Sequence, residues 1–192
     1  MAVIPVRTIA EAREFMVLEL PECGDRLTLE PVRSYPDGDR WVHQYEAGCA
    51  ELGVRREFEF TVDPKPAGEE AAVFGDGRQP SRLIDAGEWY LVSSRYLQAG
   101  AAAEKRFQQE PRPDLVEEAY EYYARASAAL LEVLKFIPPG AAAPPDPAFW
   151  TDRGRSVREQ VGDQLVRSVL EPAKAQLDDL LRAYREAYAR GT

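Results

Sequence analysis

The chain has 192 residues, and its 24 Lys and Arg against 33 Asp and Glu give a formal net charge of −9. This length suits one domain, and an acidic chain with a pI near 4.8 is a poor general binder of nucleic acid or of anionic membranes, because both attract positive charge. No apolar run approaches the ~20 residues of a membrane span and the N-terminus carries no export signal, so we expect a cytoplasmic protein with no membrane partner.

A short helix and three strands are predicted for the first third of the chain. Thr8 followed by Glu11 is a capping-box pattern, and the apolar spacing after it predicts a helix over residues 9–18. Alternation of apolar and polar residues predicts three strands, over residues 27–32, 41–45 and 54–62. Residues 63–80 are rich in Pro, Gly and Glu and indicate a surface connection.

The rest of the chain is predicted to be helical. Asp85 with Glu88 marks a second capped start, and apolar spacing predicts helices over residues 85–98, 114–137, 155–160 and 163–188. Gly100 is ambiguous between a helix end and a short bridge. Pro172 either kinks the last helix or begins a new one.

These elements predict an α+β fold, in which a small three-stranded antiparallel zinc-ribbon-like sheet packs on a helical C-terminal body. We expect residues 1–192 to form a single domain. Within it, residues 1–62 hold the first helix and the ribbon, and residues 81–192 form the helical body. No internal repeat of 20–50 residues is found.

The ribbon assignment depends on two short motifs that each read as C-x-x-C-G with one cysteine replaced: Leu20-Pro-Glu-Cys23-Gly and Cys49-Ala-Glu-Leu52-Gly. With the predicted strands they give the order knuckle, strand, turn, strand, knuckle, strand, which is the layout of a zinc ribbon. Zinc ribbons pair such knuckles because four thiolates must converge on the metal, and the glycine lets the backbone turn toward it.

Further motifs extend along the chain: Tyr35-Pro-Asp-Gly38, Arg56-Glu-Phe-Glu-Phe60, Pro80-Ser-Arg-Leu-Ile-Asp-Ala-Gly-Glu-Trp89, Glu132-Val-Leu-Lys-Phe-Ile-Pro138 and Ala148-Phe-Trp150. With them, the chain resembles an uncharacterised family of actinobacterial and myxobacterial proteins that carry two intact C-P-x-C-G knuckles. The resemblance covers most of the chain and implies the zinc-ribbon architecture without implying an activity. This chain departs from the family pattern at Leu20 and Leu52.

The two departures predict a ribbon with no metal and no other cofactor, because a structural zinc needs four ligands. We expect Cys23 and Cys49 to be neighbours and to stay free thiols in a reducing cytosol. A structural zinc contributes on the order of 10–16 kcal/mol to folding, whereas each buried Leu contributes about 1.5–3 kcal/mol. The β region should therefore depend on the helices and unfold with them in one transition.

Catalytic groups are scarce. His43 is the single histidine, so neither thiol has a second histidine to activate it, and no spacing marks a nucleophile beside a base. The glycines at Gly75 and Gly77 do not match a phosphate-binding loop. We therefore expect a protein that is not an enzyme, with a hydrolase that uses His43 as an alternative requiring a pocket.

Acidic and aromatic residues favour binding to a partner. Residues 1–100 hold 11 basic and 18 acidic side chains, whereas the remainder holds 13 and 15. Partly exposed Tyr and Trp side chains are favoured interface anchors, so the candidate contact residues are Tyr120, Tyr122, Tyr123, Trp89 and Trp150. The alternative is that these rings fill the groove between sheet and helices, and that the carboxylates only maintain solubility.

Two functions follow. The first is a non-catalytic cytosolic module, of the immunity or antitoxin type, that binds a basic partner protein through acidic and aromatic contacts. The second is a zinc-ribbon-derived regulatory protein associated with nucleic acid or the transcription machinery. The second needs a basic stripe, and the arginines near the ribbon are few against the surrounding acids, so a protein partner is expected rather than nucleic acid.

Overall fold

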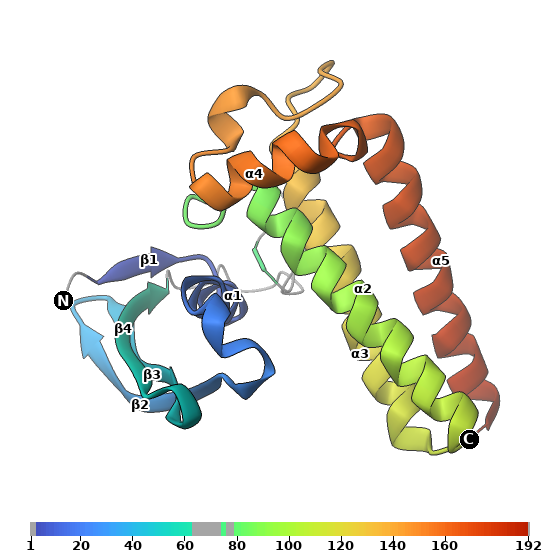
Figure 1. The fold of residues 1–192 in the computed structure, drawn as a ribbon, viewed down its shortest axis with the longest axis horizontal. Coiled ribbons are helices and arrows are strands. Elements are labelled where there is room, and N and C mark those ends of the chain that lie inside the picture. The colour runs from blue at the N-terminus through green and yellow to red at the C-terminus, as the bar shows by residue number, and fades with distance from the viewer. Residues whose placement is uncertain (1–2, 63–73, 76–78, 192) are drawn as a thin grey trace. The chain divides into compact units, whose positions relative to one another are not determined.

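The computed structural model describes residues 3–62, 74–75 and 79–191, and the chain divides into two compact units. Unit 1 spans Met1–Asp76 and unit 2 spans Gly77–Thr192. The fold class is α+β, with the sheet in unit 1 and a group of helices in unit 2 (Figure 1). Most of the connection predicted over residues 63–80 lies outside the described residues.

A four-stranded mixed sheet forms the framework of unit 1. An antiparallel meander is joined by a parallel edge strand, in the order β1-β4-β3-β2. The strands are β1 (Ile4–Val6), β2 (Thr28–Asp37), β3 (Arg40–Cys49) and β4 (Val54–Val62). The prediction of three antiparallel strands was therefore wrong, since it missed β1. Three residues are too few to show an alternation, and parallel pairing with a distant partner leaves no local sequence signal.

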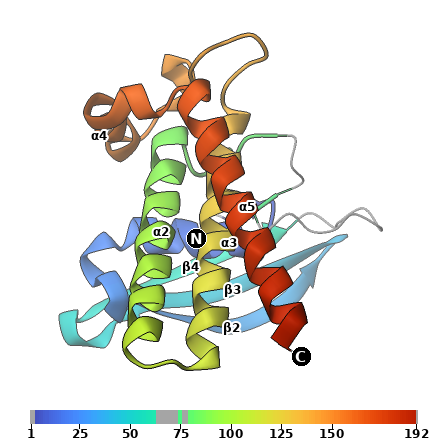
Figure 2. The same cartoon turned by 90° about the vertical axis from the view of Figure 1, so that its right-hand side faces the viewer.

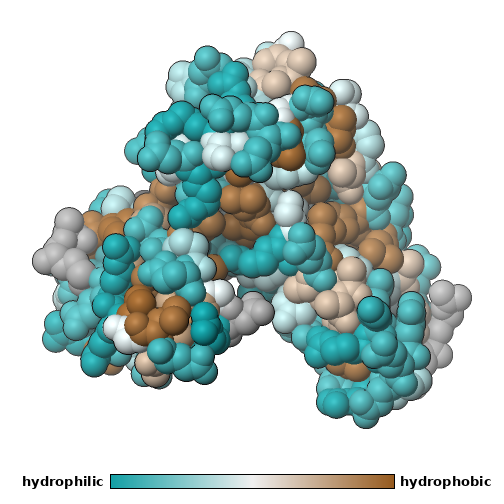
Figure 3. Space-filling model, in the orientation of Figure 1, coloured by the Kyte–Doolittle hydropathy of each residue, from teal (hydrophilic) through white to brown (hydrophobic). Residues whose placement is uncertain are grey.

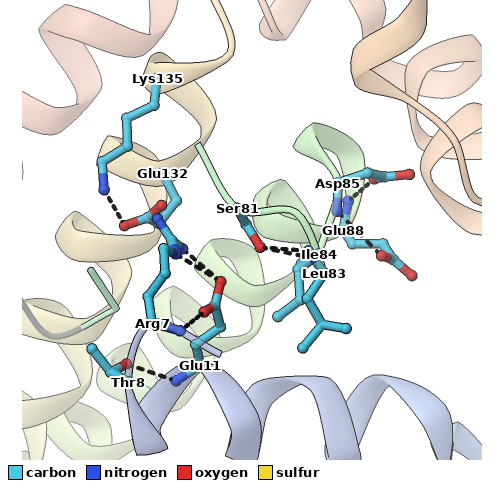
Figure 4. Close-up of polar contacts among 10 residues, drawn as sticks. All are labelled: Arg7, Thr8, Glu11, Ser81, Leu83, Ile84, Asp85, Glu88, Glu132 and Lys135. Carbon is cyan, nitrogen blue, oxygen red and sulfur yellow. Dashed lines mark hydrogen bonds and ion pairs between the residues drawn. The ribbon is translucent and has the colours of Figure 1, made fainter. Parts of the chain in front are cut away.

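Helix α1 (Ile9–Glu19) begins at the predicted cap. The Thr8 hydroxyl accepts a hydrogen bond from the Glu11 N–H at 3.1 Å. The Glu11 carboxylate turns to Arg7, accepting from its backbone N–H at 2.8 Å and pairing with its guanidinium at 2.7 Å (Figure 4). The cap is thus a modified capping box, in which the carboxylate binds the residue before the cap.

Helix α1 packs on one face of the sheet (Figure 1). The Phe15 ring stands edge-on to the rings of Phe58 and Phe60, with centroid distances of 6.2 and 6.3 Å. Edge-to-face pairs of this kind stabilise an apolar core. Because side chains alternate along a strand, Glu57 and Glu59, on either side of Phe58, point to the opposite face.

Among the described residues, unit 2 contains three long α-helices and one shorter α-helix, whose arrangement Figure 2 shows. They are α2 (Ala86–Gln109), α3 (Pro113–Lys135), α4 (Asp152–Val161) and α5 (Arg167–Gly191). Helix α2 packs along α3, while α5 packs on α3 and α4 on α2. Pro172 lies inside α5, so it does not begin a new helix. None of the helices in the described part of the chain is both long and apolar enough to cross a membrane.

Gly100 lies within α2, which runs on to Gln109. A Cβ atom at this position would lie only 2.7–2.9 Å from ring atoms of Tyr123 on α3. The glycine therefore marks a close approach of two helices, where the sequence alone left a helix end and a bridge as alternatives. The cost of glycine in a helix is offset by the packing of the Tyr123 ring.

The first turns of α2 and α4 share one buried carboxylate. Asp85 caps α2 by accepting from the Glu88 N–H at 2.9 Å (Figure 4), and it also accepts from the backbone N–H and the hydroxyl of Thr151 at 2.9 and 2.8 Å. Thr151 is itself the N-cap of α4 and binds the Gly154 N–H. The bonds from the backbone N–H groups of Glu88, Thr151 and Gly154 satisfy donors that a helix start would otherwise leave unpaired.

Candidate protein-binding surface

The face of the unit 1 sheet that points away from α1 carries a row of three carboxylates. Glu30 on β2 lies opposite Glu46 on β3, and Glu46 lies opposite Glu57 on β4. Residues directly opposite in an antiparallel pair share one face, with Cβ atoms about 4.5–5.5 Å apart. We call Glu30, Glu46 and Glu57 the acidic row.

Only the middle member of the acidic row has an ion-pair partner within the described residues. Arg55 pairs with Glu46 from the neighbouring strand. Glu30 and Glu57 are exposed, and across residues 3–62, 74–75 and 79–191 neither has a hydrogen bond or an ion pair through its side chain. Like charges directly opposite one another destabilise a sheet. The row therefore costs stability and leaves two carboxylates available to a ligand.

A polar patch adjoins the acidic row on the same face. The Arg33 Nε donates to the Gln44 side-chain oxygen at 2.7 Å, and the Arg33 guanidinium lies 5.0 Å from the centre of the Tyr35 ring. The Tyr35 hydroxyl donates to Glu59 at 3.4 Å. These side chains bind one another, whereas Glu30 and Glu57 of the acidic row have no side-chain partner among the described residues.

The edge of the sheet beside the row is protected against strand addition. β2 is an edge strand that contains Pro31 and Pro36, and its register shifts between Pro31 and Arg33. Prolines and bulges are the usual means of blocking edge-to-edge pairing. A partner would therefore approach the face of the sheet and its side chains rather than extend the ladder.

Net charge is concentrated in the unit that holds the acidic row. Residues 1–76 contain eight Lys and Arg against sixteen Asp and Glu, whereas residues 77–192 contain sixteen against seventeen. Unit 1 thus carries almost all of the net charge of −9. Such an imbalance creates a negative potential that steers cationic partners.

The knuckle positions do not converge as four ligands. Leu20, Cys23 and Cys49 are buried, while Leu52 is 44% exposed. Cys23 and Cys49 are free thiols, and Cys49 lies near enough to help raise the pKa of Cys23, which agrees with the predicted proximity. In the described chain no group of three or more His, Cys, Asp or Glu is arranged to hold a metal. A donor set of two thiols does not fit a structural zinc, which needs four ligands.

The three candidate tyrosines on α3, which we call the tyrosine cluster, are Tyr120, Tyr122 and Tyr123, and they differ in burial. Tyr123 is buried, whereas Tyr120 and Tyr122 are half-buried. Burial, and then a hydrogen bond to Glu104, raise the pKa of Tyr123 to about 12. The Tyr120 hydroxyl accepts from Arg185 at 2.8 Å. Figure 3 shows a surface that is hydrophilic over much of its area, with apolar residues gathered in several places. Tyr120 and Tyr122 are partly exposed, so they remain candidate contact residues.

The two candidate tryptophans also differ. Trp89 is fully buried, on the same stripe of α2 as Val92 and Tyr96. Trp150 is 41% exposed, with its ring 5.9 Å from that of Phe136. Burial removes Trp89 and Tyr123 from the candidate contact residues and leaves Trp150 among them.

His43 lies on β3, where its Nδ1 is 2.8 Å from the Ser34 hydroxyl of β2. The sequence did not predict this contact. The pair is exposed, and across the described residues no carboxylate contacts the ring to orient it, as a serine–histidine nucleophile would require. The pair bridges two neighbouring strands.

Comparison with protein-family models, with curated proteins and with solved structures finds no match to this chain. The resemblance to the family with paired knuckles therefore remains a prediction from the motifs. The acidic row itself was missed in the sequence, although its three glutamates fall in or beside predicted strands. Strand register, which aligns them, is not readable from one sequence.

Proposed function

We propose that the chain is a non-catalytic protein-binding module, and that the acidic row of unit 1 takes up a basic segment of a partner protein. One observation carries this proposal: Glu30, Glu46 and Glu57 lie in register across three strands, with Arg55 as the partner of Glu46 alone. Lys or Arg side chains from a partner would relieve the repulsion along the row, so binding recovers free energy that the isolated sheet loses.

The neighbouring polar patch supports the same assignment. Tyr35 and Arg33 stack beside the row and offer a ring and a guanidinium, both of which are common in binding sites. A small acidic protein of this kind acts by electrostatic steering plus a few anchors, as expected for an immunity or antitoxin type that masks a basic target.

The antiparallel meander and its two knuckles at one end of the sheet support descent from a zinc ribbon that has lost its metal. Thr28, just after the first knuckle, pairs with Gly48, just before the second. A regulator that contacts nucleic acid is the alternative function. The acidic row disfavours it, since carboxylates repel phosphates.

The test is an NMR titration of the full chain with decalysine, a defined basic probe. We expect amide shift changes concentrated on the three strands around the acidic row, with affinity falling as salt rises. The variant Glu30→Gln, Glu46→Gln, Glu57→Gln should lose this binding.

A matched control removes the same amount of charge elsewhere in unit 1, through Glu22→Gln, Asp37→Asn and Asp39→Asn. The control should bind decalysine nearly as well as the native chain. Equal weakening in the two variants would mean that net charge alone drives binding and would overturn the assignment to this face. Shift changes centred on unit 2 would do the same.

A further inference from the structure

The two cysteines of the chain come from knuckles that are distant in sequence and meet in unit 1. Cys23 lies in the short helical turn over Pro21–Arg26, which contacts β3, and Cys49 is the last residue of β3. The pairing of Thr28 with Gly48 holds the two segments together, and the Thr28 hydroxyl donates to the Gly48 carbonyl at 3.1 Å.

The two thiols are neighbours in the interior of unit 1. Both side chains are buried, at 0% and 1% exposure, and both are free. Cys49 lies near enough to Cys23 to help raise the pKa of its thiol. A disulfide needs an S–S bond of ~2.05 Å, and closing it would bring the short turn that carries Cys23 toward the end of β3.

The geometry points to a reversible disulfide between Cys23 and Cys49, a modification site that is independent of the acidic row. With two thiols and no third ligand among the described residues, closing the pair satisfies both sulfurs without a metal. The oxidant must be small because the thiols are buried, and hydrogen peroxide meets that requirement.

The reaction balances in two steps. The thiolate of one cysteine attacks a peroxide oxygen, which gives a sulfenic acid and, after protonation of the leaving hydroxide, one water. The second thiolate attacks the sulfenic sulfur, and hydroxide leaves as a second water. Two thiols and one peroxide thus become one disulfide and two waters.

Burial and the neighbouring Cys49 raise the pKa of the Cys23 thiol above its ordinary value. The thiolate fraction near neutral pH is then small, so oxidation should be slow near pH 7 and should accelerate about tenfold for each pH unit below the pKa. The disulfide joins the segment before β2 to the end of β3. It closes a loop and so lowers the conformational entropy of the unfolded chain. Oxidised protein should therefore melt at a higher temperature than reduced protein.

The test is intact-mass analysis of the full native chain treated with hydrogen peroxide at about pH 8, where the thiolate fraction is larger. We expect a loss of about 2 Da, a Cys23–Cys49 cross-linked peptide after digestion, a raised melting temperature, and full reversal by dithiothreitol. Cys23→Ser and Cys49→Ser should each abolish the mass loss and the melting shift.

The same chain unfolded in guanidinium is the control, because it shows whether hydrogen peroxide oxidises the two cysteines once they are exposed. A native chain that stays reduced while the unfolded chain oxidises would overturn the inference. Oxygen added to the separate cysteines without a cross-link would also overturn it, as would a cross-linked chain whose melting temperature is unchanged.

Discussion

Gly154 shows at the scale of single residues how closely the helical unit is packed. A Cβ atom at this position would lie 2.1 Å from both carboxylate oxygens of Asp85, the group that joins the first turns of α2 and α4. Gly87 faces the same site, since a Cβ there would lie 2.5 Å from the Gly154 carbonyl oxygen. Glycine at these positions permits the two helix starts to share one cap.

We therefore expect Gly154→Ala to lower the free energy of unfolding by about 1–3 kcal/mol, through overpacking against Asp85. Urea denaturation checks the value. Gly162→Ala is the matched control, because a Cβ at Gly162 meets nothing within 4 Å and its φ is −54°. That control should be neutral or stabilising by up to about 1 kcal/mol. Equal losses in the two variants would contradict the account of the shared cap.

Tyr123, which is buried, and Tyr184, which is half-buried, give the helical unit a defined response to alkali. Burial and Glu104 raise the pKa of Tyr123 to about 12 and raise that of Tyr184 in the same direction, from an ordinary 10. Between these values the folded chain keeps a proton that the unfolded chain releases. The free energy of unfolding must then fall as pH rises through this window.

The measurement is phenolate absorbance followed together with circular dichroism. Of the nine tyrosines, we expect Tyr123 and Tyr184 to ionise only as helicity is lost. Tyr123→Phe should make the fall in stability above pH ~10 less steep, because it removes one of the protons whose release is linked to unfolding; burial also raises the pKa of Tyr90 and Tyr122. Ionisation of all tyrosines near their ordinary pKa in a chain that stays helical would be inconsistent with the burial of these rings.

At the scale of residues, a contact can be predicted from the sequence when its partners are close together along the chain. The caps at Thr8 and Asp85 could be predicted, because each depends on residues three apart in the sequence. Which of the tyrosines on α3 is buried could not be predicted in this way. A step of three residues from Ala119 reaches Tyr122 and a step of four reaches Tyr123, and both steps are compatible with a helix. Tyr123 is the buried ring because Gly100 on α2 has no side chain and leaves room for it.

At the scale of elements, the carboxylates of the acidic row lower the stability of the sheet through repulsion, and the same carboxylates are the groups proposed to bind a partner. Glu57→Gln should raise the free energy of unfolding by about 0.2–1 kcal/mol, because it removes repulsion with Glu46. Urea denaturation at low salt measures the change, with Glu22→Gln as the control for loss of one charge in the same unit. A variant no more stable than its control would show that the row costs nothing.

The sequence predicts elements better than it predicts their pairing. The helices of unit 2 follow from apolar spacing, and the strands of the meander follow from alternation, although β2 and β3 extend beyond the predicted residues. Strand β1 and the register that creates the acidic row depend on contacts between distant segments. No local pattern encodes those contacts, so the candidate site emerged only from the structure.

At the scale of the whole molecule, charge is divided between the two units. Unit 1 carries nearly all of the net charge and has two free thiols, where the zinc-ribbon prediction would need four ligands to hold a metal. Of the two leucines at the knuckle positions only Leu20 is buried, and burial of one such side chain contributes about 1.5–3 kcal/mol against roughly 10–16 kcal/mol for a structural zinc. The prediction that the chain unfolds in one transition rests on that difference. Calorimetry should show one endotherm, and two resolved endotherms would contradict it.

The central claim is that the acidic row binds a basic protein segment. Native mass spectrometry of the chain, affinity-purified from the cells that make it, tests this claim most directly when three forms are compared. The native chain and the control with Glu22→Gln, Asp37→Asn and Asp39→Asn should each retain the same protein in fixed ratio. The variant with Glu30→Gln, Glu46→Gln and Glu57→Gln should be recovered alone. Retention of that partner by all three forms, or by none, would contradict the account.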